Sequence, residues 1–174
     1  MKNTKNIVST ALFIAIGIAL PLAFHSIPNG GRIFLPMHIP VLLCGLLCGL
    51  PYSLACGIIT PLLSSLLTGM PPAAMLPSML CELAVYSVAA SLLMRFLPIK
   101  KPLPRIVISL IGAMLAGRLV LGLLNWLIFN AGSYSLGAWL TSSFVTALPG
   151  IAVQIILIPA VAFALQKMFL KENN

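Results

Sequence analysis

Charged side chains are rare in this sequence, and the ones inside its apolar runs are the first candidates for chemistry. Glu82 and Arg118 each lie within a long apolar run, and Gln154 lies within a third. A charge at bilayer depth costs about 2.5 to 3.5 kcal/mol even on the permissive insertion scale, so such groups pair with each other or line a cavity. Two hypotheses therefore stay open. Glu82 and Arg118 brace two helices as a salt bridge, or they contact a bound ligand.

Further polar residues follow these two at helical spacing. Tyr86 comes four residues after Glu82, and Asn125 comes seven residues after Arg118, which places each pair on one helix face. Asn130 follows in the next loop. A single buried cation suits a small ligand with one carboxylate, because a guanidinium can hold both carboxylate oxygens. We expect Glu82 to orient Arg118 from the side, and the amide side chains to supply the remaining hydrogen bonds.

Several classes of protein are excluded by what the chain lacks. The sequence has two acidic residues in all, so it offers no carboxylate pair and no metalloprotease or Ser-His-Asp motif. It has no phosphate-binding loop for ATP. Cys44 and Cys48 are spaced as two small packing residues of one helix face, which we favour over a metal site. We expect no enzyme activity, no cofactor, no metal and no nucleic-acid partner.

Composition and hydropathy predict the elements that must position these residues. The chain is 60% hydrophobic and 7% charged, and its mean hydropathy is +1.12. These values indicate an integral membrane protein. The apolar segments predict an all-α, compact bundle of six transmembrane helices in a single domain, residues 1–174, with helices over 7–24, 37–50, 52–69, 78–97, 106–129 and 141–169.

The positions of the basic residues predict the orientation of the chain. Arg32 lies in a loop on one side of the predicted bundle, whereas most of the ten Lys and Arg residues lie at the termini or in the loop between the fourth and fifth helices. By the positive-inside rule both termini are cytoplasmic. The net charge of +8 also favours attraction to anionic membrane lipid. The residues on the cytoplasmic side are Lys2, Lys5, Arg95, Lys100, Lys101, Arg105, Lys167 and Lys171.

The second apolar segment is short for a membrane-spanning helix. A helix that begins at about His38 and ends near Leu50 covers about 20 Å at 1.5 Å per residue, against a hydrocarbon core of about 30 Å. The loop before it, from His25 to Pro36, has an apolar tip that includes Phe34, which suggests a lid. A late helix start beneath this lid leaves room for an outward-opening cavity. Alternatively, the helix is merely short and tilted neighbours cover it.

Small residues recur at four-residue intervals in the first helix. Ala11, Ala15 and Ala19 form a smooth stripe along which another helix can approach closely. The stripe either packs inside the bundle or is the docking face for a partner membrane protein.

The chain resembles the substrate-binding S components of energy-coupling factor (ECF) vitamin transporters. The blocks "LPMHIPVLLCGLLCG", "PLLSSLLTGMPP", "CELAVYS" and "AMLAGRLVLG" are similar to those of one subgroup, and Ala11 and Ala15 match the alanine stripe. The resemblance implies a multi-pass protein of a prokaryotic plasma membrane that captures a micronutrient from outside. It also implies a complex with one transmembrane scaffold protein, which contacts the stripe, and two ATPase subunits.

The resemblance places the ligand near the outer surface, between the first loop and the last three helices. Our predicted substrate-binding residues are Arg118, Glu82, Asn125, Gln154, Tyr86, His38, Phe34 and Asn130. Few aromatic residues are available to stack on a large flat ring. Pantothenate is the favoured substrate, with nicotinate, a pyridoxine-like molecule or a cobalamin-type ligand as alternatives. The alternative from another functional class is a small membrane assembly protein without a transport role.

Overall fold

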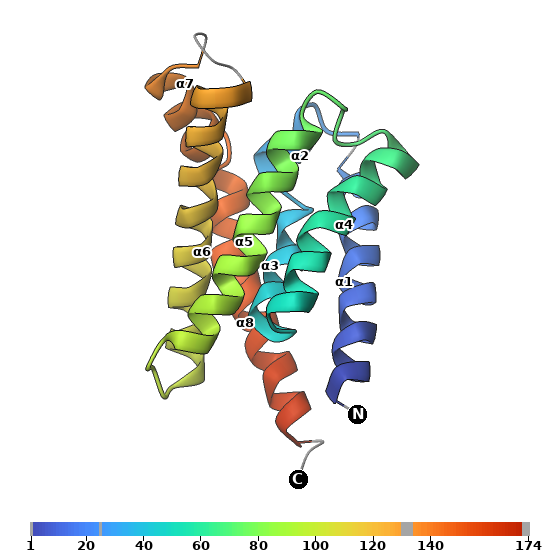
Figure 1. Ribbon diagram of the computed structural model, residues 1–174, viewed down its shortest axis with the longest axis vertical. Helices are drawn as coiled ribbons and strands as arrows, with labels where there is room; N and C mark the ends of the chain where they lie inside the picture. The colour runs from blue at the N-terminus through green and yellow to red at the C-terminus, as the bar shows by residue number, and fades with distance from the viewer. Residues whose placement is uncertain (1, 25, 130–133, 172–174) are drawn as a thin grey trace.

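The structure is a computed structural model that describes residues 2–24, 26–129 and 134–171. These residues form helices joined by short connections (Figure 1). The helices are α1 Lys2–Ala23, α2 Gly30–Phe34, α3 His38–Leu47, α4 Leu50–Thr68, α5 Leu76–Phe96, α6 Pro102–Leu124, α7 Leu136–Leu140 and α8 Leu148–Lys171, with the π-helical turns η1 Asn125–Phe129 and η2 Thr141–Val145.

Six of the helical stretches are long and apolar enough to cross a membrane, which confirms the predicted all-α membrane architecture. Their outer faces carry large exposed hydrophobic side chains, among them Leu66, which is 80% exposed, and Ile156, which is 74% exposed. Such faces are stable against lipid, because lipid tails are as apolar as these side chains.

The second span differs from the short helix that the sequence predicts. The helix α3 does begin at His38, but the segment before it contains α2, and together they form an apolar stretch from Gly30 to Leu47 that is long enough to span. The join is Leu35, whose left-handed φ of 49° turns the chain between the two helices. The expected loop from His25 to Pro36 is therefore partly helical. His25 itself lies outside the described residues.

The last two spans also begin elsewhere than predicted. The helix α6 begins at Pro102 rather than at residue 106, because proline fits the first turn of a helix, where its missing N–H needs no partner. The predicted helix over 141–169 is interrupted. Its first residues form η2, and α8 begins at Leu148 with Pro149 in its first turn.

Glycines let the central helices approach one another closely. A Cβ atom on Gly57 of α4 would lie 2.6 Å from Ser87 Oγ and 2.8 Å from the carbonyl oxygen of Leu83, both on α5. A Cβ on Gly45 of α3 would lie 2.8 Å from the carbonyl oxygen of the same Ser87. Small residues at such contacts are the usual means of tight helix packing in membranes. The helices α3 and α4 therefore both pack against α5.

The two ends of the bundle differ in charge. The start of α1, the connection between α5 and α6, and the end of α8 lie at one end, whereas α2, α7 and the connection between α4 and α5 lie at the other (Figure 1). Lys100 and Lys101 lie in the α5–α6 connection, and Arg32 lies in α2 at the opposite end. The basic residues are thus grouped at one end, as the sequence predicts.

The close approach at Gly57 gives a first prediction. We expect Gly57→Ala to lower the free energy of unfolding by about 1 to 3 kcal/mol, because the contacted carbonyl oxygen belongs to a helix backbone and cannot move aside. Thermal unfolding of the purified protein in detergent measures the effect. Gly31→Ala is the matched control, since no atom lies within 4 Å of a Cβ at that position. Equal melting temperatures for the two variants would contradict this packing.

Candidate functional site

Buried polar side chains from four helices gather near the end of the bundle that carries α2 and α7. His38 is the first residue of α3, Glu82 and Tyr86 lie on α5, Arg118 lies on α6, and Gln154 lies on α8. Their exposed fractions are 3%, 8%, 0%, 3% and 0%, in that order. Burial of polar groups is unfavourable unless hydrogen bonds or charges compensate for the lost water. The contacts of these five residues, called the polar cluster below, therefore decide what the site can do.

His38 and Glu82 are in direct contact in the polar cluster. The distance from His38 Nε2 to Glu82 Oε2 is 3.6 Å, which is longer than a hydrogen bond and is an ion pair only when the ring is protonated. Both ring nitrogens of His38 are buried without a hydrogen-bond partner. The His38 ring also stands edge-on to the ring of Tyr86, with centroids 5.3 Å apart, and the Tyr86 hydroxyl makes no hydrogen bond of good geometry. Several groups that can form hydrogen bonds therefore lie close together here without hydrogen-bond partners.

Arg118 is enclosed by the segment that follows α7. Its Nη1 donates a hydrogen bond to the carbonyl oxygen of Ser143, and its guanidinium lies 5.6 Å from the ring centroid of Phe144. Its own carbonyl oxygen accepts a hydrogen bond of 3.0 Å from Trp139 Nε1. The Nε and Nη2 atoms are buried and have no partner. One edge of the guanidinium is therefore bound to the protein, whereas two further donors remain for another acceptor.

Of the two hypotheses for Glu82 and Arg118, the direct salt bridge is not formed among the described residues. The Glu82 carboxylate contacts His38, and Arg118 turns instead toward the backbone of η2. The backbone of η2 offers the arginine a nearer acceptor than the carboxylate does. Arg118 is consequently not neutralised by a direct carboxylate contact.

Gln154 connects the polar cluster to the turn between α2 and α3. Its Nε2 donates to the carbonyl oxygen of Leu35 over 3.4 Å, and its Oε1 is buried without a partner. The backbone N–H of His38 donates to the same carbonyl oxygen over 3.1 Å. The turn at Leu35 therefore fixes both the start of α3 and the amide of Gln154, and it leaves one acceptor atom of that amide available.

The remaining predicted site residues lie outside the polar cluster. Asn125 is buried, and its Nδ2 donates to the carbonyl oxygen of Leu121 in its own helix over 2.9 Å. Phe34 is half-buried and stacks near Phe24, with ring centroids 5.1 Å apart. Asn130 lies outside the described residues. The structure thus brings together five of the eight predicted residues.

Sequence reasoning missed the contribution of η2. Ser143 and Phe144 hold Arg118, but the sequence predicts a regular helix through both positions, and a Thr-Ser-Ser-Phe run carries no specific signal for a π-helical turn. Trp139 of α7, which donates to the Arg118 carbonyl oxygen, was also not among the predicted site residues. Its indole lies over Gly122, where a Cβ would stand 2.5 Å from Nε1.

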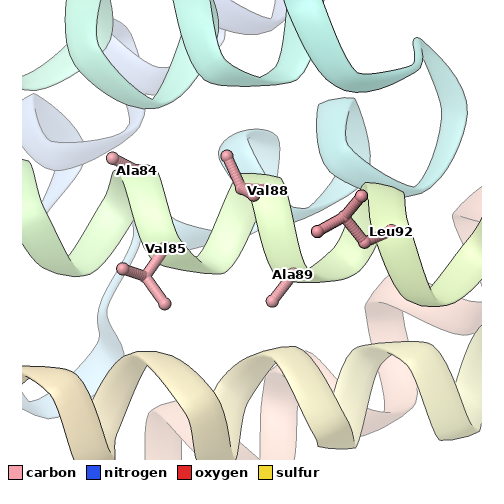
Figure 2. A pocket seen from close by; sticks show the side chains of 5 residues that line it. All are labelled: Ala84, Val85, Val88, Ala89 and Leu92. Atoms are coloured by element: carbon pink, nitrogen blue, oxygen red, sulfur yellow. The ribbon is translucent and has the colours of Figure 1, made fainter.

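Two hollows in the described part of the chain lie outside the polar cluster. One hollow of about 260 Å³ lies along α5 and is lined by the aliphatic side chains of Ala84, Val85, Val88, Ala89 and Leu92 (Figure 2). Another, of about 280 Å³, lies beside Trp126 and Trp139. Neither includes a residue of the polar cluster, so the outward-opening cavity stays a prediction.

The alanine stripe of α1 faces away from the bundle. Ala11, Ala15 and Ala19 are exposed, whereas Phe13 and Gly17 on the opposite face are buried against the neighbouring helices. Packing of the stripe inside the bundle is therefore excluded. It forms a smooth outer surface on a helix that is mostly exposed, since only 17% of its apolar stretch is buried.

Comparison with known proteins identifies the family. The sequence model of the family described as "ECF transporter, substrate-specific component" matches residues 5–162, which is most of the chain. Searches of curated proteins and of solved structures give no match. A match of this extent, on a chain with six helices able to span a membrane, supports a multi-pass membrane protein that binds a micronutrient for transport. The chain belongs to the substrate-specific components of ECF transporters.

Proposed function

We propose that this protein captures a small carboxylate-bearing vitamin at the polar cluster, with pantothenate the favoured substrate. The observation that carries the proposal is the buried guanidinium of Arg118, whose Nε and Nη2 atoms have no partner. These two donors lie side by side on one edge of the guanidinium, the geometry that binds both oxygens of a carboxylate. Leaving such donors buried and unpaired is unfavourable, so a bound carboxylate would stabilise the site.

The other groups of the polar cluster favour a ligand with hydroxyl or amide groups. Gln154 Oε1 can accept a hydrogen bond, the Tyr86 hydroxyl can donate or accept one, and none of these atoms has a partner. Pantothenate carries a carboxylate, an amide and two hydroxyl groups. Nicotinate offers only the carboxylate and a ring nitrogen, and a pyridoxine-like molecule lacks the carboxylate. A cobalamin-type ligand stays a further alternative.

The proposed orientation and partners follow from the family and the charge distribution. The basic end of the bundle, with Lys100 and Lys101, faces the cytoplasm, so the polar cluster lies toward the outside of a prokaryotic plasma membrane. The alanine stripe docks on the scaffold protein, and two ATPase subunits complete the importer. Since the sequence has no nucleotide-binding loop, the energy of transport comes from these partners.

Ligand binding tests the proposed function directly. We expect a saturable rise in the melting temperature of the purified protein with one member of a panel of water-soluble vitamins. A ligand that binds only the native state stabilises it by about 2.7 kcal/mol at a hundredfold excess over the dissociation constant. Mass spectrometry of the purified protein would identify a retained molecule. If no member of the panel shifts the melting temperature, a structural or assembly role is favoured instead.

The role of Arg118 is tested by removing its guanidinium. We expect Arg118→Ala to raise the dissociation constant for pantothenate by about 30-fold or more, since loss of one partner of a buried charge pair costs about 2 to 5 kcal/mol. Equilibrium binding measures this change. The uncharged alcohol pantothenol should bind the wild-type protein more weakly than pantothenate by a similar factor. Arg95→Ala is the control, because Arg95 is exposed near the opposite end of the bundle. Tight binding by the Arg118 variant would contradict the proposed role.

If the alanine stripe is the docking face, a substitution there should affect vitamin uptake but not ligand binding. We expect Ala15→Trp to abolish vitamin uptake by cells that also express the scaffold protein and the ATPases, because a bulky ring holds the two helices apart. Ligand binding by the purified variant should stay within about twofold of wild type, since the altered surface faces away from the bundle. Ala152→Trp, at an exposed alanine of α8, is the matched control and should retain uptake. Loss of binding in the Ala15 variant would refute the assignment.

A further inference from the structure

The buried charges of the polar cluster are balanced when the His38 ring is neutral. Arg118 carries one positive charge, and Glu82 carries one negative charge when ionised. Both are almost fully buried, with exposed fractions of 3% and 8%. If His38 is neutral, the two charges sum to zero, which is the arrangement that costs least in a low-dielectric interior.

A carboxylate ligand disturbs this balance. It brings one negative charge to Arg118, and the sum of the buried charges then becomes minus one unless a further positive charge appears. An unbalanced charge is strongly disfavoured where water is excluded. Binding therefore requires either that the ligand be neutral or that a group of the polar cluster take up a proton.

His38 is the group placed to take up this proton. Histidine is the side chain that most readily exchanges a proton in the physiological range. Its Nε2 lies 3.6 Å from the Glu82 carboxylate, so a charge on the ring would be paired at once. Both ring nitrogens are without a hydrogen-bond partner, so the nitrogen that carries no proton in the neutral ring is open to receive one.

The surroundings of His38 contain few other groups that could serve. On α5, Glu82 and Tyr86 face His38. The helix α6 contributes Arg118, which is already charged. From α8 it receives the neutral amide of Gln154. The helices α1 and α4 also pack against α3, but their ionisable residues lie toward its other end, near Cys44. These more distant groups are Lys2 and Lys5 on α1, Tyr52 and Cys56 on α4, and Lys167 on α8.

We infer that the site binds a monocarboxylate together with one proton, which His38 accepts from solvent. The inference rests on the proposed function and deepens it. One ligand anion and one proton enter together, so the buried charge stays at zero. A dicarboxylate would leave a negative charge uncompensated, and an uncharged or cationic vitamin would require no proton. The substrate class is thus a monoanion, and its affinity falls as the pH rises.

Isothermal titration calorimetry measures the proton directly. Titration of pantothenate and of nicotinate into the purified full-length protein at pH 8, in two buffers with different ionisation enthalpies, should show uptake of about one proton per bound ligand. The dissociation constant should rise with pH between pH 7 and pH 8.5. The uncharged partners pantothenol and nicotinamide should bind weakly and without proton uptake.

Two variants locate the proton. His38→Gln should bind the same acid with a dissociation constant that no longer depends on pH over this range. Cys81→Ser is the control, because Cys81 adjoins Glu82 in sequence but is not part of the polar cluster. Its pH profile should follow the wild type.

The outcomes distinguish this inference from the proposed function. Binding of either acid without proton uptake, or with a pH-independent dissociation constant, would overturn the inference and leave a vitamin-binding protein. Tighter binding of pantothenol or nicotinamide than of the corresponding acid would also overturn the inference. If no vitamin of the panel binds, the proposed function fails, and the inference fails with it.

Discussion

The burial of Arg118 is the constraint on which the arrangement of the site depends. A guanidinium that is 3% exposed in a membrane-spanning helix must find acceptors within the protein. The structure supplies one from the backbone of η2, at Ser143, and an aromatic face from Phe144. A π-helical turn departs from the regular pattern of an α-helix, and such turns are frequent at functional sites. The irregular segment after α7 is therefore explained by the arginine that it encloses.

Close helix packing makes the rest of the polar cluster possible. Gly117 precedes Arg118 in α6, and a Cβ there would collide with the ring of Tyr86. The glycine lets the tyrosine ring fit between α5 and α6, edge-on to His38. Gly150 has the same role at the start of α8, where a Cβ would lie 2.6 Å from the carbonyl oxygen of Ile33 in α2. Small residues thus bring the elements of the cluster within contact distance, and the polar groups then select their partners.

Much of this arrangement can be predicted from the sequence, because hydropathy and helical spacing are local properties. Hydropathy and helical spacing predict the long apolar segments and the start of α3 at His38. They also identify Glu82, Arg118 and Gln154 as polar residues within spans. The partners of those residues do not follow. Which side chain Glu82 meets depends on the rotation of α5 against α3, and that rotation is set by the glycine contacts between helices. The acceptor of Arg118 is a backbone atom, whose availability no residue type reveals.

The helix α3 links the two proposed functional surfaces of the molecule. It packs against α1, whose outer face carries the alanine stripe, and against α5 and α8, which contribute to the polar cluster. Thr10 of α1 contacts Cys44 of α3, with Oγ1 and Sγ 3.7 Å apart, and His38 stands at the start of the same helix. Most of α3 is buried, so it cannot shift without disturbing its neighbours on both sides. A rigid central helix of this kind keeps the polar cluster in a fixed position relative to the exposed stripe. The two surfaces are therefore physically connected, although no side chain belongs to both.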